Sequence, residues 1–157
     1  MTTETNVVER EVRIAARPET VFSYFIDPAK MVLWKGTDAT LDPRPGGVYR
    51  VDVTPRDIAV GTYVELVPYR RIVFTWGWEG ENSPIPPGSS IVEIDLIPDG
   101  NGTLLRLRHV GLPTEETRSL HAIGWEHYLE RLATRASGGD PGADPWLAGP
   151  PMPVHNQ

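Results

Sequence analysis

The chain has 157 residues, a formal net charge of −6 at pH 7 and no cysteine. This length suits one domain, which buries enough surface to fold without a metal or a crosslink. The lack of cysteine excludes disulfides, thiolate nucleophiles and metal sites with cysteine ligands, and it fits a reducing, cytoplasmic location. The negative charge argues against nucleic acid and anionic membranes as partners. The sequence shows neither a signal peptide nor an apolar run of about 18 residues.

The N-terminal part predicts a strand followed by two short helices. Residues 1–6 are polar and are expected to be disordered. Residues 7–16 alternate imperfectly between apolar and charged side chains, as a half-buried strand does. Pro18 favours the start of a helix, and Pro28 favours its end. A second helix is expected at about residues 28–34.

The middle of the chain predicts about six antiparallel strands separated by turns. The sequence Pro-Asp-Gly-Asn-Gly at 98–102 is a strong hairpin signal. The Pro-rich segment 80–88 is too long for a tight hairpin. The clearest strands are expected at 48–53, 58–67, 70–78, 89–97 and 103–110.

A long helix is predicted next, with Thr114 as its N-cap and Gly138 at its end. This order predicts an α+β helix-grip fold, in which a curved antiparallel sheet of six to seven strands wraps round the C-terminal helix. We assign residues 7–137 to this single domain. Residues 138–157 form a Pro/Gly-rich tail, and its Trp146 is a candidate to dock on the body. One face of the helix carries Leu120, His121, Gly124, Trp125, Tyr128, Leu129 and Leu132.

Several short motifs resemble those of one known family, and they occur in the family's order. They are Pro45 to Arg50, Gly61 to Pro68, Arg71 to Trp76, Gly102 to Leu107, and Gly124-Trp125 with Tyr128-Leu129. This series is similar to the activators of the 90-kilodalton heat-shock-protein ATPase, in the START-related, Bet v-like helix-grip (SRPBCC) superfamily. The resemblance spans about residues 8–136. It implies a stand-alone bacterial-type member with a role in the stress response, within a superfamily of lipid carriers, cyclases, receptors and co-chaperones.

Aromatic side chains are the first candidate site. Five tryptophans are many for this length, and Trp and Tyr carry polar tips that need partners. Each alone is more often part of a core. As a group, between a curved sheet and one helix, they predict a cavity of about a few hundred Å³. The candidate ligand-binding residues are Phe25, Trp34, Tyr49, Tyr63, Trp76, Trp78, Ile94, His109, His121, Trp125 and Tyr128.

The pair His109 and His121 is predicted to face this cavity. One of them is a candidate general base or ligand-orienting donor. The favoured alternative is that both are buried histidines with hydrogen-bond partners. No metal site is expected, because a third ligand is missing. Glu65 with Arg50 and Arg71 is a further candidate, and it remains open between a buried carboxylate–guanidinium pair and cross-strand pairing on the outer face.

We expect the protein to bind a small hydrophobic molecule, without a cofactor and without catalysing a reaction. Access is expected near the 80–88 segment. Two alternatives stay open: a polyketide cyclase/aromatase-like or hydrolase-like enzyme that uses the same cavity, and a co-chaperone-type module that binds another protein. A homodimer through a sheet edge or the tail also stays open.

Overall fold

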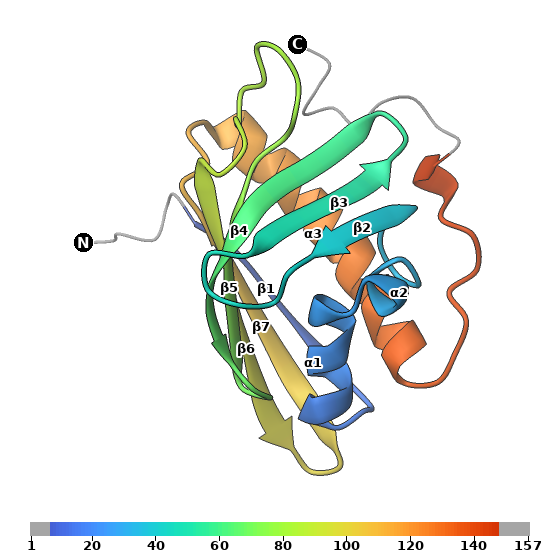
Figure 1. Ribbon diagram of the computed structural model, residues 1–157. Helices are drawn as coiled ribbons and strands as arrows, with labels where there is room; N and C mark the ends of the chain where they lie inside the picture. The colour runs from blue at the N-terminus through green and yellow to red at the C-terminus, as the bar shows by residue number, and fades with distance from the viewer. Residues whose placement is uncertain (1–6, 148–157) are drawn as a thin grey trace.

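A curved antiparallel sheet wraps round one long helix in the computed structural model, which describes residues 7–147 (Figure 1). The predicted α+β helix-grip arrangement is confirmed. The predicted disorder of residues 1–6, and the tail after residue 147, lie outside the described residues. In chain order the elements are β1 (Val7–Ile14), α1 (Pro18–Ile26), α2 (Pro28–Met31), β2 (Asp38–Leu41), β3 (Val48–Thr54), β4 (Asp57–Val67), β5 (Arg71–Trp76), β6 (Ser90–Asp99), β7 (Gly102–Val110), α3 (Glu115–Ala136) and the 3-10 helix η1 (Pro145–Leu147).

The sheet has seven strands in the order β1-β7-β6-β5-β4-β3-β2, and all neighbouring strands pair antiparallel. The hairpin between β6 and β7 forms where the turn sequence predicts it. The edge strand β2 is not among the strands singled out from the sequence. Its residues alternate between exposed and partly buried positions, but four residues are too few to give a strong signal in the sequence.

An irregularity in β4 explains why its inward face is ambiguous in the sequence. The pairing with β5 shifts between Tyr63 and Glu65. Ala59 and Tyr63 are buried before the shift, and Leu66 packs on the core after it. The inward positions thus change from odd to even numbers, as a bulge requires. Glu65 lies outside and pairs with Arg71 at 3.0 Å, where an ion pair contributes little stability.

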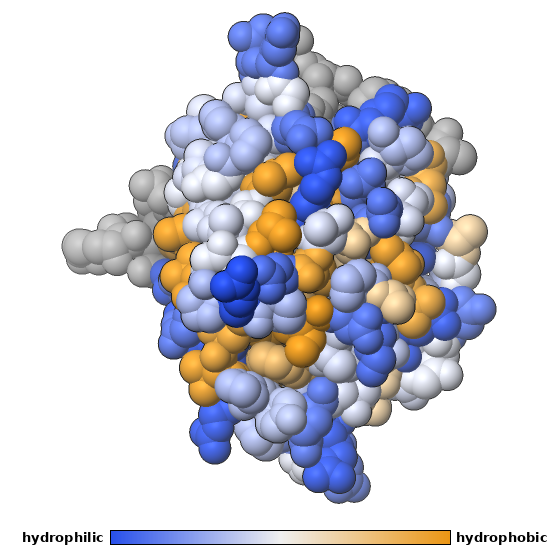
Figure 2. All heavy atoms as spheres, in the orientation of Figure 1, coloured by the Kyte–Doolittle hydropathy of each residue, from blue (hydrophilic) through white to orange (hydrophobic). Residues whose placement is uncertain are grey.

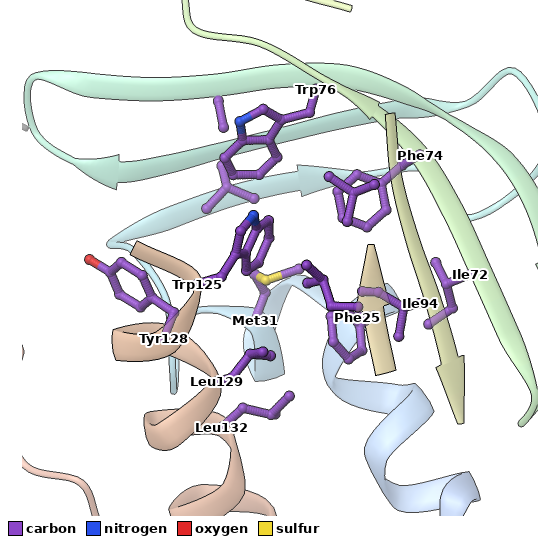
Figure 3. Packing of buried hydrophobic residues seen from close by; sticks show 14 of the residues in the cluster. Phe25, Met31, Ile72, Phe74, Trp76, Ile94, Trp125, Tyr128, Leu129 and Leu132 are labelled. Carbon is purple, nitrogen blue, oxygen red and sulfur yellow. The ribbon is translucent and has the colours of Figure 1, made fainter. Parts of the chain in front are cut away.

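Helix α3 begins and ends where the sequence predicts. The Thr114 hydroxyl accepts a hydrogen bond from the Thr117 N–H at 3.1 Å and caps the first turn. Gly138, with φ +99°, follows the last turn. Figure 3 shows Leu129 and Leu132 of α3 facing the side chains of α1 and of the sheet. The helix therefore closes the core on the concave side of the sheet.

The segment after α3 returns along the helix and is fastened at Asp144. This carboxylate accepts hydrogen bonds from the Tyr128 hydroxyl at 2.6 Å and from His127 Nε2 at 2.9 Å. The Trp146 ring stacks on His127 with centroids 3.9 Å apart. Burial tends to raise the pKa of Asp144, but these hydrogen bonds outweigh it and hold that pKa below its usual value. The described part of the tail therefore docks on the body.

Replacing Asp144 by alanine is expected to detach this segment from α3. The free energy of unfolding should fall by about 1–3 kcal/mol, because the buried Tyr128 hydroxyl and the partly buried His127 ring lose their acceptor. Urea denaturation measures the loss. The control is Asp140→Ala, because Asp140 pairs at 3.3 Å with Arg135 while 77% of its own side chain is exposed. An equal loss in both variants would contradict the role of Asp144.

Candidate functional site

A small cavity lies between the sheet and α3. Its volume is about 20 Å³, which is room for about one water molecule. The predicted volume of a few hundred Å³ is therefore wrong. The reason is aromatic packing: the Trp76 ring centroid lies 5.2 Å from both Trp78 and Trp125. The lining residues are Lys35, Val53, Trp76, Trp78, Leu120, His121, Gly124, Trp125 and Tyr128.

Five of the eleven predicted ligand-binding residues line this cavity. They are Trp76, Trp78, His121, Trp125 and Tyr128. The other six are buried in the surrounding core: Phe25, Trp34, Tyr49, Tyr63, Ile94 and His109. Figure 3 shows Trp76 of β5 close to Trp125 of α3, with Tyr128 beside Trp125 on the same helix.

The six core residues support the cavity rather than line it. Tyr63 donates its hydroxyl to the Phe25 carbonyl oxygen at 2.7 Å, and Trp34 donates its indole N–H to the Tyr24 carbonyl oxygen at 3.1 Å. The Tyr49 ring stacks on the ring of Phe74 with centroids 4.1 Å apart. The polar tips of Tyr63 and Trp34 thus donate to backbone oxygens, whereas the Tyr49 hydroxyl accepts a hydrogen bond from Lys35 Nζ at 3.1 Å.

His109 takes part in a chain of hydrogen bonds that fixes its tautomer. Trp125 Nε1–H donates to His109 Nδ1 at 3.0 Å. An indole nitrogen is only a donor, so the imidazole proton sits on Nε2. From there His109 donates to Ser90 Oγ at 2.8 Å, and Ser90 in turn donates to the Trp76 carbonyl oxygen at 2.8 Å. Both ring nitrogens of His109 are therefore used.

His121 is held in the opposite tautomer. Trp78 Nε1–H donates to His121 Nε2 at 2.9 Å, and His121 Nδ1–H donates to the Thr117 carbonyl oxygen at 2.8 Å. Burial lowers the pKa of His121 to about 4. Burial, and then the nearby His121 and Lys35, lower that of His109. Both rings are neutral at pH 7 with no free acceptor, which favours the structural alternative over a general base.

Lys35 is the functional candidate that the sequence did not single out. Its side chain lines the cavity and the residue is only 2% exposed. Its Nζ lies 3.1 Å from the Tyr49 hydroxyl, 4.6 Å from the Trp76 ring centroid and 4.7 Å from that of Trp125. Within residues 7–147 the salt bridges do not include Lys35. Burial alone lowers the pKa of Lys35 to about 7.

The backbone after α2 sets the direction of Lys35. The Lys35 N–H donates to the Met31 carbonyl oxygen at 2.9 Å and extends the last helical turn. Gly36 then adopts φ +89°, and an added Cβ there would lie 2.5 Å from the Asp52 carbonyl oxygen of β3. Only glycine fits this position. The one clue in the sequence is that Lys35 is one of two lysines in an arginine-rich chain.

Trp76, which also lines the cavity, carries a further polar group, its indole N–H. Trp76 is 3% exposed, and its Nε1 has no hydrogen-bond partner among residues 7–147. A buried donor without an acceptor costs about 1–3 kcal/mol.

Within residues 7–147, the His, Asp and Glu side chains form no group of three that could hold a metal ion. No helix within residues 7–147 is both long and apolar enough to cross a membrane.

Comparison with known proteins decides the family. The sequence pattern described as "Activator of Hsp90 ATPase homolog 1-like protein" matches residues 15–137. The chain belongs to this family. The resemblance inferred from the motifs is thus confirmed, together with its helix-grip fold. No curated protein matches the chain.

Three solved structures resemble the chain, and one of them is of an AHSA1-like protein. The AHSA1-like protein of Rhizobium etli is 49% identical, covers 92% of this chain and 89% of its own, and has a TM-score of 0.72. CalU16 of Micromonospora echinospora is 29% identical, covers 84% of this chain and 76% of its own, and has a TM-score of 0.68. An Aha1 protein from Colwellia psychrerythraea, solved as a dimer, is 15% identical over 85% of this chain and 97% of its own, with a TM-score of 0.73. This last likeness concerns the fold alone.

Proposed function

We propose that this AHSA1-like protein binds a small, largely apolar molecule in the cavity between the sheet and α3. The supporting observation is the combination of aromatic walls with a buried donor that has no acceptor, the Nε1–H of Trp76. Apolar walls stabilise a ligand by about 25 cal/mol per Å² of buried apolar surface. The free donor favours a ligand that carries an oxygen acceptor. The proposed ligand is therefore a small aromatic or aliphatic molecule with one hydroxyl or carbonyl oxygen.

Binding requires the cavity to widen. A dry cavity that holds benzene has a volume of about 150 Å³, against the 20 Å³ found here. The wall contributed by α3 offers space most easily, because Gly124 has no side chain and Leu120 is only partly buried. Widening costs free energy, so we expect weak affinity, with Kd between about 1 μM and 1 mM.

The 80–88 segment supports the side of the cavity that Trp78 lines, opposite α3. Its Ile85 is fully buried, and the Ile85 carbonyl oxygen accepts a hydrogen bond from the Trp78 N–H at 2.7 Å. A movement of this segment would therefore move Trp78, which lines the cavity. That coupling supports the expectation that a ligand enters the cavity near residues 80–88, which stays a prediction.

The replacement Gly124→Leu tests the proposal by filling the space that a ligand would use. The wild-type protein is expected to retain a small apolar molecule in a native mass spectrometry screen of lipids and aromatic metabolites. Gly124→Leu should weaken that binding at least about tenfold, because its side chain enters the cavity. Ile123→Ala on the same helix is the matched control, because Ile123 is 55% exposed. Equal binding by all three proteins, or no retained molecule across the screen, would contradict the proposal.

The two alternative functions stay predictions. The cyclase-like or hydrolase-like enzyme needs a titratable group with a free lone pair at the cavity, and Lys35 rather than either histidine is the candidate for it. The co-chaperone module needs an exposed apolar patch of several hundred Å². Figure 2 shows hydrophobic residues interrupted by hydrophilic ones on the face displayed. A homodimer and a cytoplasmic location likewise stay predictions for this chain.

A further inference from the structure

Two polar side chains that line the cavity, Lys35 and Trp76, lie near a third, Tyr49, in the core beside it. Lys35 brings an amine, Tyr49 a phenol 3.1 Å from that amine, and Trp76 an indole N–H without a partner. Lys35 and Trp76 line the cavity, and the Lys35 Nζ lies 4.6 Å from the Trp76 ring centroid. The rest of the wall is mostly apolar. An amine in such a setting is suited to nucleophilic attack on a carbonyl group.

We propose that Lys35 forms a reversible imine with a small apolar aldehyde that occupies this cavity. The inference rests on the proposed function, since the aldehyde would use the same space between the sheet and α3. It goes further by naming the carbonyl group as the recognised part of the ligand and Lys35 as the residue that bonds to it.

The environment of Lys35 keeps part of the amine unprotonated near neutral pH. Burial lowers its pKa to about 7. The titratable groups around it are Tyr49 from β3, His109 from β7, and His121 and Tyr128 from α3. Both histidines have lowered pKa values, and both tyrosines have raised ones. All four are therefore neutral at pH 7, so none of them stabilises an ammonium ion by its charge.

The reaction balances without any further reactant. The nitrogen lone pair of Lys35 attacks the aldehyde carbon, and the carbonyl π bond opens onto oxygen. The Tyr49 hydroxyl donates a proton to that oxygen and takes one back from the nitrogen, which gives the carbinolamine. The Tyr49 hydroxyl then donates a proton to the carbinolamine oxygen and takes the remaining proton from the nitrogen. The C–O bond breaks and the C=N bond forms. The two amine hydrogens and the aldehyde oxygen leave as one water molecule.

Trp76 has a defined part in these steps. Its Nε1–H is a donor that needs an acceptor, and the aldehyde or carbinolamine oxygen supplies one. The aromatic rings around Lys35 limit access of bulk water, which slows hydrolysis of the imine. Trp76 is a positioning residue in this scheme, whereas Lys35 forms the covalent bond to the aldehyde carbon.

The test is reductive trapping with benzaldehyde and sodium cyanoborohydride, followed by intact mass and peptide mapping. The chain has two lysines, Lys30 and Lys35, so the site of a benzyl adduct is easily assigned. We expect one benzyl group on Lys35 in the wild type and in Lys30→Met, and its loss in Lys35→Met. We expect the trapping rate to level off above about pH 7, whereas an ordinary lysine becomes more reactive up to about pH 10. Tyr49→Phe should trap at least about tenfold more slowly.

Two outcomes would overturn the inference. One is an adduct confined to Lys30 or the N-terminal amine, unchanged in Lys35→Met. The other is the absence of an adduct on a protein that binds benzyl alcohol, the analogue without a carbonyl group. In the second case the proposed function would stand while the inference fails. If neither benzaldehyde nor benzyl alcohol binds, the cavity proposal fails as well.

Discussion

Replacing Lys35 by methionine is expected to raise the free energy of unfolding at pH 7 by about 3 kcal/mol. Burial lowers the pKa of Lys35 from 10.5 to about 7, which at pH 7 is equivalent to about 4 kcal/mol of lost stability. The replacement recovers only part of this, because methionine cannot hydrogen-bond to Tyr49, which costs about 1 kcal/mol. Methionine has a similar length and fills the same space. Urea denaturation at pH 7 measures the change.

The pH dependence of stability gives an independent test of the same claim. Between pH 7 and 10.5 the unfolded chain binds a proton at Lys35 that the folded protein releases. The contribution of Lys35 to the free energy of unfolding of the wild type should therefore rise with pH across this interval, and Lys35→Met should lack this rise. The two proteins should converge in stability near pH 10.5. Lys30→Met is the control, because Lys30 is only partly buried and bonds to Ser23 at 3.0 Å. A destabilised Lys35→Met protein with an unchanged pH profile would contradict the account.

Replacing Trp125 by alanine is expected to lower the free energy of unfolding by about 3–5 kcal/mol. Trp125 is 3% exposed and its ring packs against Trp76. The change also leaves His109 Nδ1 without its donor. Trp125→Phe keeps most of the ring packing and should cost less, about 1–2 kcal/mol. Chemical denaturation of the two variants, with Trp146→Ala as a partly buried control, measures the difference.

The result that would contradict this role of Trp125 is a loss no larger than that of Trp146→Ala. Trp146 packs on His127 at the surface of α3, outside the cavity. An equal cost would mean that the packing between the sheet and α3 contributes no more than the docking of the tail. A similar loss in Trp125→Ala and Trp125→Phe would instead assign the stability to the hydrogen bond with His109.

Local patterns were enough to predict the outline of the fold. The turn at 98–102 predicts the β6–β7 hairpin, and Thr114 marks the start of α3, because these signals act within a few residues. The inward face of β4 was not predictable, because the bulge between Tyr63 and Glu65 depends on pairing with β5. A bulge leaves no clear mark on the alternation of one strand.

The candidate site was predicted only in part, for a related reason. The apolar spacing along α3 places Trp125 and Tyr128 at the cavity, since helical periodicity determines which residues share a face. The volume of the cavity depends on how the rings of Trp76 and Trp78 pack, which spacing does not encode. Lys35 was missed because a single lysine is usually exposed. Its burial follows from the turn at the end of α2, where a helical turn and a positive-φ glycine direct it inward.

Titration of the indole N–H signals with benzyl alcohol, followed by ¹H–¹⁵N NMR, tests the central claim most directly. The five tryptophans report on different parts of the molecule. The account predicts the largest shift at Trp76, whose N–H gains an acceptor, and smaller shifts at Trp78 and Trp125. The indole N–H signals of Trp34, which donates to a backbone oxygen, and of Trp146, on the outer side of α3, should not shift. Unchanged spectra, or shifts confined to Trp146, would contradict binding between the sheet and the helix.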